Sequence, residues 1–211
     1  MPDMPRPATL STESIAAAAL RVGDREGVKA MSMRRIAAEL GCDPMSLYRH
    51  FPDREALLDA VADLALADAP DPRPDQPWDE RLVAVLTSIR STALRHPGIA
   101  AHLAGRPPLD RHGRRLAGAI IGALAEAGLP PADVIRATQA LIAYLAAALA
   151  MNLRAGAPDP RWHELRRVIS ALPGALPDDA LPVTGSDDQF GYGLDLLIAG
   201  IRVEAQRART S

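Results

Sequence analysis

The stretch that decides the fold runs from Ser32 to Leu58 and reads SMRRIAAELGCDPMSLYRHFPDREALL. Apolar residues recur in its first part at helical spacing, at Ile36, Ala37 and Leu40. The letters GCDP then mark a break, because glycine ends helices in the left-handed conformation and Asp-Pro suits the start of the next helix. The stretch therefore predicts two short helices joined by a tight turn, which are the dimensions of a helix-turn-helix.

Helices are also expected on both sides of this stretch. Ser11 is predicted to cap a helix that ends near Gly27, and Asp53 to cap a fourth helix that continues to Leu64. Later helices are expected over residues 78–96, 109–128, 131–155, 162–172 and 187–207. Because alternating strand patterns are not found, the predicted fold class is all-α.

Composition narrows the class of protein. The 211 residues are 48% hydrophobic and 24% charged, with a formal net charge of −2, which is typical of a globular chain. The single cysteine, Cys42, excludes an internal disulfide and a zinc site built from several thiolates. The longest uninterrupted apolar run, Ala140–Met151, is shorter than the ~20 residues of a membrane helix. We therefore expect a cytoplasmic protein with no membrane partner.

The second short helix has the side chains of a nucleic-acid surface. Leu47 and Phe51 can face the core, which leaves polar and basic residues on the remaining faces. From Lys29 to Arg54 basic residues outnumber acidic ones by two, whereas acidic residues outnumber basic ones by three over residues 1–69. Basic charge gathered in this way suits the neutralisation of phosphates. An ordinary helical hairpin without a ligand is the alternative.

These residues resemble the TetR family of bacterial repressors over roughly residues 11–68. The resemblance rests on SMRRIA at 32–37, LG at 40–41, SLYRHF at 46–51 and REALL at 54–58. It implies double-stranded operator DNA as a partner. It also implies a C-terminal domain that dimerises and binds a small-molecule inducer. No cofactor, metal or catalytic residue is expected.

The resemblance assigns roles in DNA binding residue by residue. The candidates are Arg34, Pro44, Met45, Ser46, Tyr48, Arg49, His50 and Arg54. Arg34 would reach a guanine or a phosphate, and Met45 would offer apolar contact to a base. Tyr48 and His50 would hydrogen-bond phosphates. The role of Arg49 stays open, and the neighbouring Arg35 is expected to be a solvated charge.

The C-terminal half is similar to the tetracycline-repressor branch of the family. HLAGRP at 102–107 resembles a loop beside the inducer, and FGYGLDLL at 190–197 resembles the last dimerising helix. The ligand-binding candidates are His102 and Arg106, from that loop, and Ile89, Gln139 and Tyr144, from position alone. Pocket positions that are polar in the branch align with Pro70, Val85 and Gly118, so we expect a fairly apolar inducer.

The predicted organisation has three parts. Residues 1–69 would form a three-helix helix-turn-helix DNA-binding domain with the fourth helix as a connector. Residues 70–77, of which four are proline, would form a stiff linker. Residues 78–211 would form a helical ligand-binding and dimerisation domain. Its most apolar helices would be simple core, or would pair with a second copy in an isologous homodimer that reads a palindrome.

Other function classes stay open at this point. An enzyme is disfavoured because paired carboxylates, a thiol–histidine pair and a metal cluster are not found. A helical binding module whose helix-turn-helix no longer contacts DNA is the second alternative. Activation instead of repression is the third, since the residues do not distinguish the two.

Overall fold

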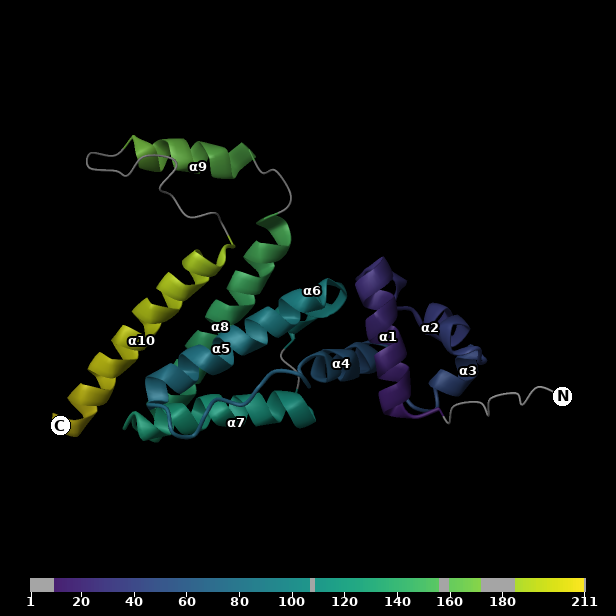
Figure 1. Ribbon diagram of the computed structural model, residues 1–211, viewed down its shortest axis with the longest axis horizontal. Coiled ribbons are helices and arrows are strands. Elements are labelled where there is room, and N and C mark those ends of the chain that lie inside the picture. Colours follow the sequence, from purple (N-terminus) through teal and green to yellow (C-terminus); the bar gives the residue numbers. More distant parts are fainter. Residues whose placement is uncertain (1–9, 107–108, 156–159, 172–184, 211) are drawn as a thin grey trace. The chain divides into compact units, whose positions relative to one another are not determined.

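The computed structural model describes residues 10–106, 109–155, 160–171 and 185–210. Over these residues it consists of α-helices and a 3-10 turn, without strands (Figure 1). The elements are α1 (Thr12–Glu26), η1 (Val28–Ala30), α2 (Met33–Leu40), α3 (Pro44–Leu47), α4 (Arg54–Ala65), α5 (Trp78–Arg95), α6 (Pro97–Gly105), α7 (Arg111–Glu126), α8 (Pro131–Ala155), α9 (Pro160–Ser170) and α10 (Asp187–Thr210). The all-α prediction is confirmed.

The first helices begin and end where local signals predict. Side-chain oxygens of Ser11, Ser32, Asp43 and Asp53 each accept a hydrogen bond from a backbone N–H in the first turn of α1, α2, α3 and α4. Gly41 ends α2 with φ at +65°, in the left-handed region. These caps satisfy backbone groups that the short helices would otherwise leave without partners.

The chain divides into two compact units. The first contains residues 1–71 and 87–118, and the second contains residues 72–86 and 119–211. The predicted boundaries at residues 69 and 78 separate the expected DNA-binding domain, linker and C-terminal domain by function. They do not coincide with this division into compact units. The reason is α6, a helix that the sequence analysis did not predict, which packs against α1 and α4.

The contact between α1 and α6 brings two backbones together. A Cβ atom added to Gly98 would lie 2.3 Å from the carbonyl carbon of Gly23. Beside this contact, His96 Nδ1 lies 2.9 Å from Asp24 Oδ2. Gly98 therefore permits an approach that no larger residue at that position would allow.

The end of α4 is held by the start of α7. Buried Asp63 accepts hydrogen bonds from the backbone N–H groups of His112, at 3.1 Å, and Gly113, at 2.7 Å. Arg115 in turn donates to the carbonyl oxygen of Ala69, at 2.8 Å. The Asp63 carboxylate thus binds at the positive, N-terminal end of α7. The Arg115 guanidinium binds a carbonyl group just after the C-terminal end of α4.

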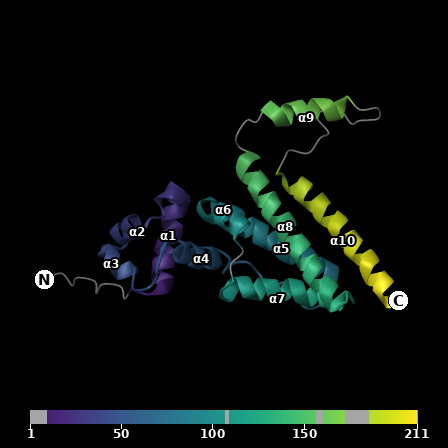
Figure 2. The ribbon, with the colours of Figure 1, turned by 180° about the vertical axis from the view of Figure 1, so that it is seen from behind.

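In the second unit α8 and α10 lie side by side and antiparallel (Figures 1 and 2). The Tyr144 hydroxyl donates to the carbonyl oxygen of Phe190, at 2.7 Å, and their rings stack with centroids 5.5 Å apart. Near the other end of the pair, Arg209 donates to the carbonyl oxygen of Ala127. These contacts set the register of α10.

Helix α8 is more apolar than its longest uninterrupted run suggested. Over Pro131–Leu153 its mean hydropathy reaches 1.6, so by length and composition alone this segment is sufficient to cross a membrane. Core helices of soluble proteins meet the same criterion when they are mostly buried. Here only 22% of the apolar window is buried within the chain.

Candidate nucleic-acid interface

The helix-turn-helix is built from α2 and α3. Ile36 and Leu47 are fully buried between these helices and their neighbours, and Phe51 is nearly so. The α-helix of α3 ends at Leu47, and residues 48–50 form a turn. The carbonyl oxygen of Leu47 accepts from both His50 N, at 2.9 Å, and Phe51 N, at 3.0 Å. Because Phe51 precedes a proline, the helical conformation is disfavoured there, so the helix tightens and ends.

Most of the predicted DNA contacts lie at the surface of this motif. Met45 is 67% exposed and Tyr48 47% exposed. Arg34 and Arg49 are exposed as well, and Pro44, Ser46 and His50 are half-buried. The motif therefore hides its packing residues and presents the side chains that could reach a duplex.

Arg54 differs from the other candidates, because its guanidinium is engaged within the chain. Nε donates to the carbonyl oxygen of Met31, at 3.0 Å, and Nη2 to that of Val28, at 2.8 Å. These carbonyls belong to η1 and the residue that follows it, between α1 and α2. Arg54 thus joins the start of α4 to the chain just before α2, and its contact with DNA stays a prediction.

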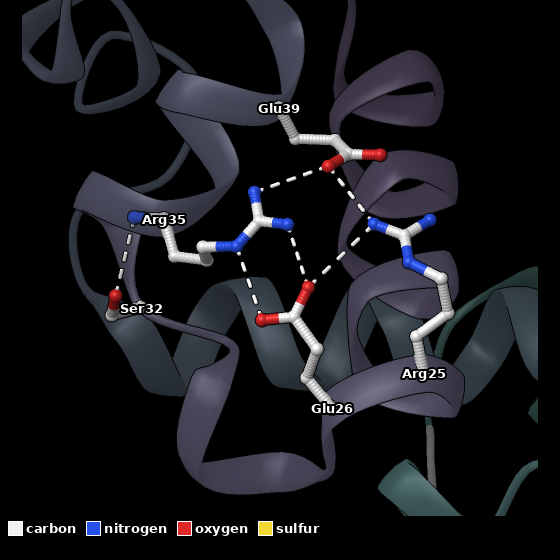
Figure 3. A network of polar contacts seen from close by, with 5 residues as sticks. All are labelled: Arg25, Glu26, Ser32, Arg35 and Glu39. Atoms are coloured by element: carbon white, nitrogen blue, oxygen red, sulfur yellow. Dashed lines mark hydrogen bonds and ion pairs between the residues drawn. The ribbon is translucent and has the colours of Figure 1, made fainter.

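Arg35, which was expected to be a solvated charge, is 34% exposed and forms ion pairs within the chain. Its guanidinium pairs with Glu26 at 2.6 Å and with Glu39 at 3.1 Å, and Arg25 reaches the same Glu39 oxygen at 2.9 Å (Figure 3). The hydrogen bond from Arg35 lowers the pKa of Glu26, and the one from Arg25 lowers the pKa of Glu39. The bond to Glu26 also raises the pKa of Arg35. This network joins the end of α1 to α2.

The ligand candidates His102 and Arg106 lie at the end of α6, which is helical where a loop was expected. His102 Nε2 lies 2.9 Å from Asp59 Oδ1, and Arg106 Nε lies 2.7 Å from the same oxygen. The structure thus brings these two residues together on a carboxylate of α4. Sequence reasoning missed Asp59; the signal was an acidic pair, Asp59 and Asp63, one helical turn apart in the otherwise apolar run 56–65.

The remaining ligand candidates are divided between the two units. Ile89 is half-buried in the first unit, whereas Gln139 and Tyr144 belong to the second. Gln139 is exposed on α8, and Tyr144 holds α10 through Phe190. Over the residues that the structure describes, no three acidic, histidine or cysteine side chains converge to hold a metal ion.

Comparison with known proteins identifies both halves of the chain. Residues 15–61 match the model of bacterial regulatory proteins of the tetR family, and residues 70–205 match the tetracyclin repressor-like C-terminal domain. The chain belongs to the TetR family. The predicted resemblance is confirmed, and the helix-turn-helix is the DNA-binding motif of a transcriptional regulator.

TetR-family relatives match nearly the whole chain. An HTH-type transcriptional regulator of Saccharopolyspora erythraea is 30% identical over 205 residues, which cover 93% of this chain and 86% of the relative. The class A tetracycline repressor from transposon 1721 of Escherichia coli is 29% identical over 200 residues, covering 91% of this chain and 90% of the relative. The DNA-binding half and the C-terminal half of this chain are thus found together in other transcriptional regulators.

Solved TetR-family structures share the fold. Apo ActR of Streptomyces coelicolor has a TM-score of 0.79 at 29% identity. The match covers 95% of this chain and 99% of the ActR chain. ActR in complex with actinorhodin has a TM-score of 0.74 at 27% identity, with coverages of 94% and 99%. BioQ of Mycobacterium smegmatis with its double-stranded DNA operator has a TM-score of 0.67 at 25% identity, with coverages of 92% and 99%.

Proposed function

We propose that this TetR-family regulator is a cytoplasmic homodimeric repressor, not an enzyme, that is released from a palindromic operator by a fairly apolar small molecule. The observation that carries the proposal is the helix-turn-helix itself. Its interior residues are buried, its helix ends are capped, and Met45, Tyr48, Arg34 and Arg49 remain exposed. Relatives whose names include "repressor", and BioQ solved with its operator, support this function.

The chemistry of the exposed side chains suggests how DNA would be contacted. Arg34 would hydrogen-bond a guanine edge or a phosphate, and Met45 would contact a thymine methyl group. Tyr48 and His50 would donate to phosphates, which position the protein without reading sequence. Pro44, Ser46 and Arg49 complete this surface and are proposed contacts as well. Arg54, held by η1, would act by fixing α4 against the motif.

A second copy of the chain would cover the apolar face of the second unit. On α10, Tyr192 is 70% exposed and Leu196 58% exposed, and Val203 continues this stripe at helical spacing. Beside it a groove of about 390 Å³ runs between α8 and α10 and is lined mainly by apolar side chains. Contiguous exposed apolar patches mark interaction sites. Pairing α8 and α10 with their copies would bury them in a four-helix bundle.

Leu196→Glu tests the dimer. It would place a charge within the paired face, so the variant should sediment as a monomer at concentrations where the wild type is a dimer. Leu109→Glu is the matched control, because Leu109 is also exposed to solvent, at 73%, but lies in the first unit. Unchanged sedimentation of the Leu196 variant would remove α10 from the interface. Partition of the wild type into lipid vesicles would instead favour a membrane role for α8.

The proposed inducer would act by changing the population of conformers. It would favour a dimer whose two α3 segments no longer match half-sites about one helical turn apart. Linkage then requires the operator to weaken inducer binding by the same factor. An apolar inducer is supported by Val85, which is buried at a position that the resemblance aligns with a polar residue of the tetracycline-repressor branch.

The test is selection of duplexes from genomic fragments at near-physiological salt, followed by sequencing. An enriched palindrome is expected, and Arg34→Ala should weaken binding to it. If Arg34 contacts a phosphate, the variant should lower the slope of log operator affinity against log salt concentration by about one. If it contacts a guanine, the variant should relax sequence specificity at one position of the operator. Arg21→Ala, an exposed arginine of α1, is the control. No enrichment over a scrambled competitor would refute the proposal and favour the helical binding module.

A further inference from the structure

A closed ring of four charged side chains joins the end of α1 to α2 (Figure 3). Arg25 and Glu26 are the last two residues of α1, and they alternate in the ring with Arg35 and Glu39, one turn apart on α2. The ion-pair distances are 2.6 Å from Arg35 to Glu26, 3.7 Å from Glu26 to Arg25, 2.9 Å from Arg25 to Glu39 and 3.1 Å from Glu39 to Arg35. These four residues form the ion ring, in which the positive and negative charges balance.

Arg35 is the member of the ion ring that fixes a direction. Its Nε and Nη2 atoms donate to the two oxygens of Glu26, at 3.1 and 2.6 Å, and its Nη1 atom pairs with Glu39 at 3.1 Å. All three guanidinium nitrogens are therefore engaged within the chain. A guanidinium that binds through two parallel N–H donors is restricted in direction as well as in distance, whereas apolar burial is non-directional. The ion ring thus supplies a directional restraint that the buried face of this eight-residue helix does not.

The residue next to Arg35 is the arginine that is proposed to contact DNA. Arg34 is exposed, and no ion pair of its side chain is found within the part of the chain that the structure describes. Adjacent residues of an α-helix point about 100° apart, so a side chain at position 35 that is tied to α1 also determines where the side chain at position 34 points. The two neighbouring arginines therefore differ: carboxylates bind one, and the other is available to a duplex.

We propose that the ion ring sets the rotation of α2 about its own axis, which makes Arg35 and Glu39 positioning residues for operator recognition through Arg34. The inference rests on the proposed function, in which Arg34 contacts the operator. A side chain that is already directed at its target loses less freedom on binding. Removal of the ion ring therefore weakens operator binding, although none of its members contacts DNA.

The substitution Glu39→Ala gives a change whose sign separates positioning from simple electrostatics. It removes a negative charge beside the DNA-binding surface, so by charge alone it raises the affinity for DNA. Loss of positioning acts in the opposite direction. A good contact between an arginine and a base is worth about fivefold or more in affinity, and we expect operator affinity to fall by roughly that factor.

Glu13→Ala is the matched control for this change in charge. Glu13 is exposed in the first turn of α1, whereas the ion ring is at the last turn of that helix. The control removes the same charge and leaves the ion ring intact, so its operator affinity does not fall. Exposed ion pairs add little to stability, so both variants are expected to fold.

A double-mutant cycle shows whether the ion ring acts through Arg34. Arg34→Ala and Glu39→Ala each weaken operator binding, and in the double variant Glu39→Ala adds little to the loss caused by Arg34→Ala. A ring that only stabilised the fold would cause the same loss of affinity in both backgrounds. The measurements use the full-length protein and the palindromic duplex with the highest affinity in the selection, below the melting temperature of every variant.

The outcomes separate this inference from the function on which it rests. If the wild type retains no duplex, or if Arg34→Ala binds the operator as the wild type does, the inference falls together with the proposed role of Arg34. If Arg34→Ala weakens binding but Glu39→Ala binds equally well or more tightly, or the cycle is additive, only the positioning role is refuted. Should Glu39→Ala melt below the assay temperature, Glu26→Gln carries the test from the other side of the ion ring. The same fall is expected, and wild-type affinity of that variant overturns the inference.

Discussion

Replacing Gly98 by alanine is the most direct test of how α6 meets α1. The added Cβ would lie 2.3 Å from both the carbonyl carbon and oxygen of Gly23 and 2.8 Å from its Cα. Non-bonded carbon atoms rest about 3.5–4.0 Å apart, so the two helices would have to separate by roughly 1.2 Å or more. Both sides of the contact are backbone, so no change of rotamer can relieve it.

The expected loss of stability follows from these distances. Overpacking a well-packed site costs about 1–3 kcal/mol, and a backbone contact that cannot adapt belongs at the upper end, about 3 kcal/mol. Alanine regains at most ~1 kcal/mol of helix propensity over glycine. The net destabilisation is therefore about 2–3 kcal/mol. For a chain of this size it corresponds to a melting temperature lower by roughly 4–12 °C.

Thermal unfolding at fixed protomer concentration measures this change, since dimerisation makes melting temperatures depend on concentration. Gly118→Ala is the matched control, because a Cβ at that exposed helical position meets no heavy atom within 4 Å. The control should be stabilised by up to about 1 kcal/mol. A Gly98→Ala protein that melts at or above the wild-type temperature would refute the backbone-to-backbone packing of α1 and α6.

Other predictions concern polar contacts. The pKa values of Glu26 and Glu39 are lowered in the folded protein, so the stability they contribute is complete above pH 4.5 and is lost as the pH falls through their folded values. Arg35→Met should therefore melt earlier than the wild type near neutral pH, and the difference should shrink on acidification below 4.5; a constant difference would contradict the ion-pair account. Asp63→Ala removes a charged acceptor from two backbone N–H groups and should destabilise the protein by about 2–3 kcal/mol in urea unfolding; an effect below about 0.5 kcal/mol would mean that water replaces the carboxylate. Tyr144→Phe deletes the hydroxyl that donates to α10 but keeps the ring, so it should cost about 1 kcal/mol, and wild-type stability would show that this hydrogen bond contributes nothing.

The parts of the fold that could be predicted are those with local causes. A cap joins an oxygen to an N–H two or three residues away, so Ser11, Ser32, Asp43 and Asp53 could be assigned from their neighbours alone. The left-handed conformation of Gly41 could likewise be predicted, because a glycine directly after a short helical pattern is a common helix end. The helix-turn-helix and its family followed from these signals together with the spacing of apolar residues.

Helix α6 could not be predicted because its own residues favour it weakly. It has nine residues and includes two glycines, which lower helix propensity. Short isolated helices are marginal in water, and most of their stability comes from packing. Here that packing comes from α1 and α4, which are distant in sequence. The segment 102–107 was therefore expected to be a loop.

The sequence by itself determined the fold class, the motif and the residues that it exposes, since all three depend on periodicity and on contacts within a few positions. Tertiary structure alone decided the partners of the charged and polar side chains. Arg54 binds a carbonyl group 26 positions away, His102 a carboxylate 43 positions away and Tyr144 a carbonyl group 46 positions away. Hydrogen bonds act over about 3 Å, so which groups meet depends on how the helices pack, and no local pattern records that.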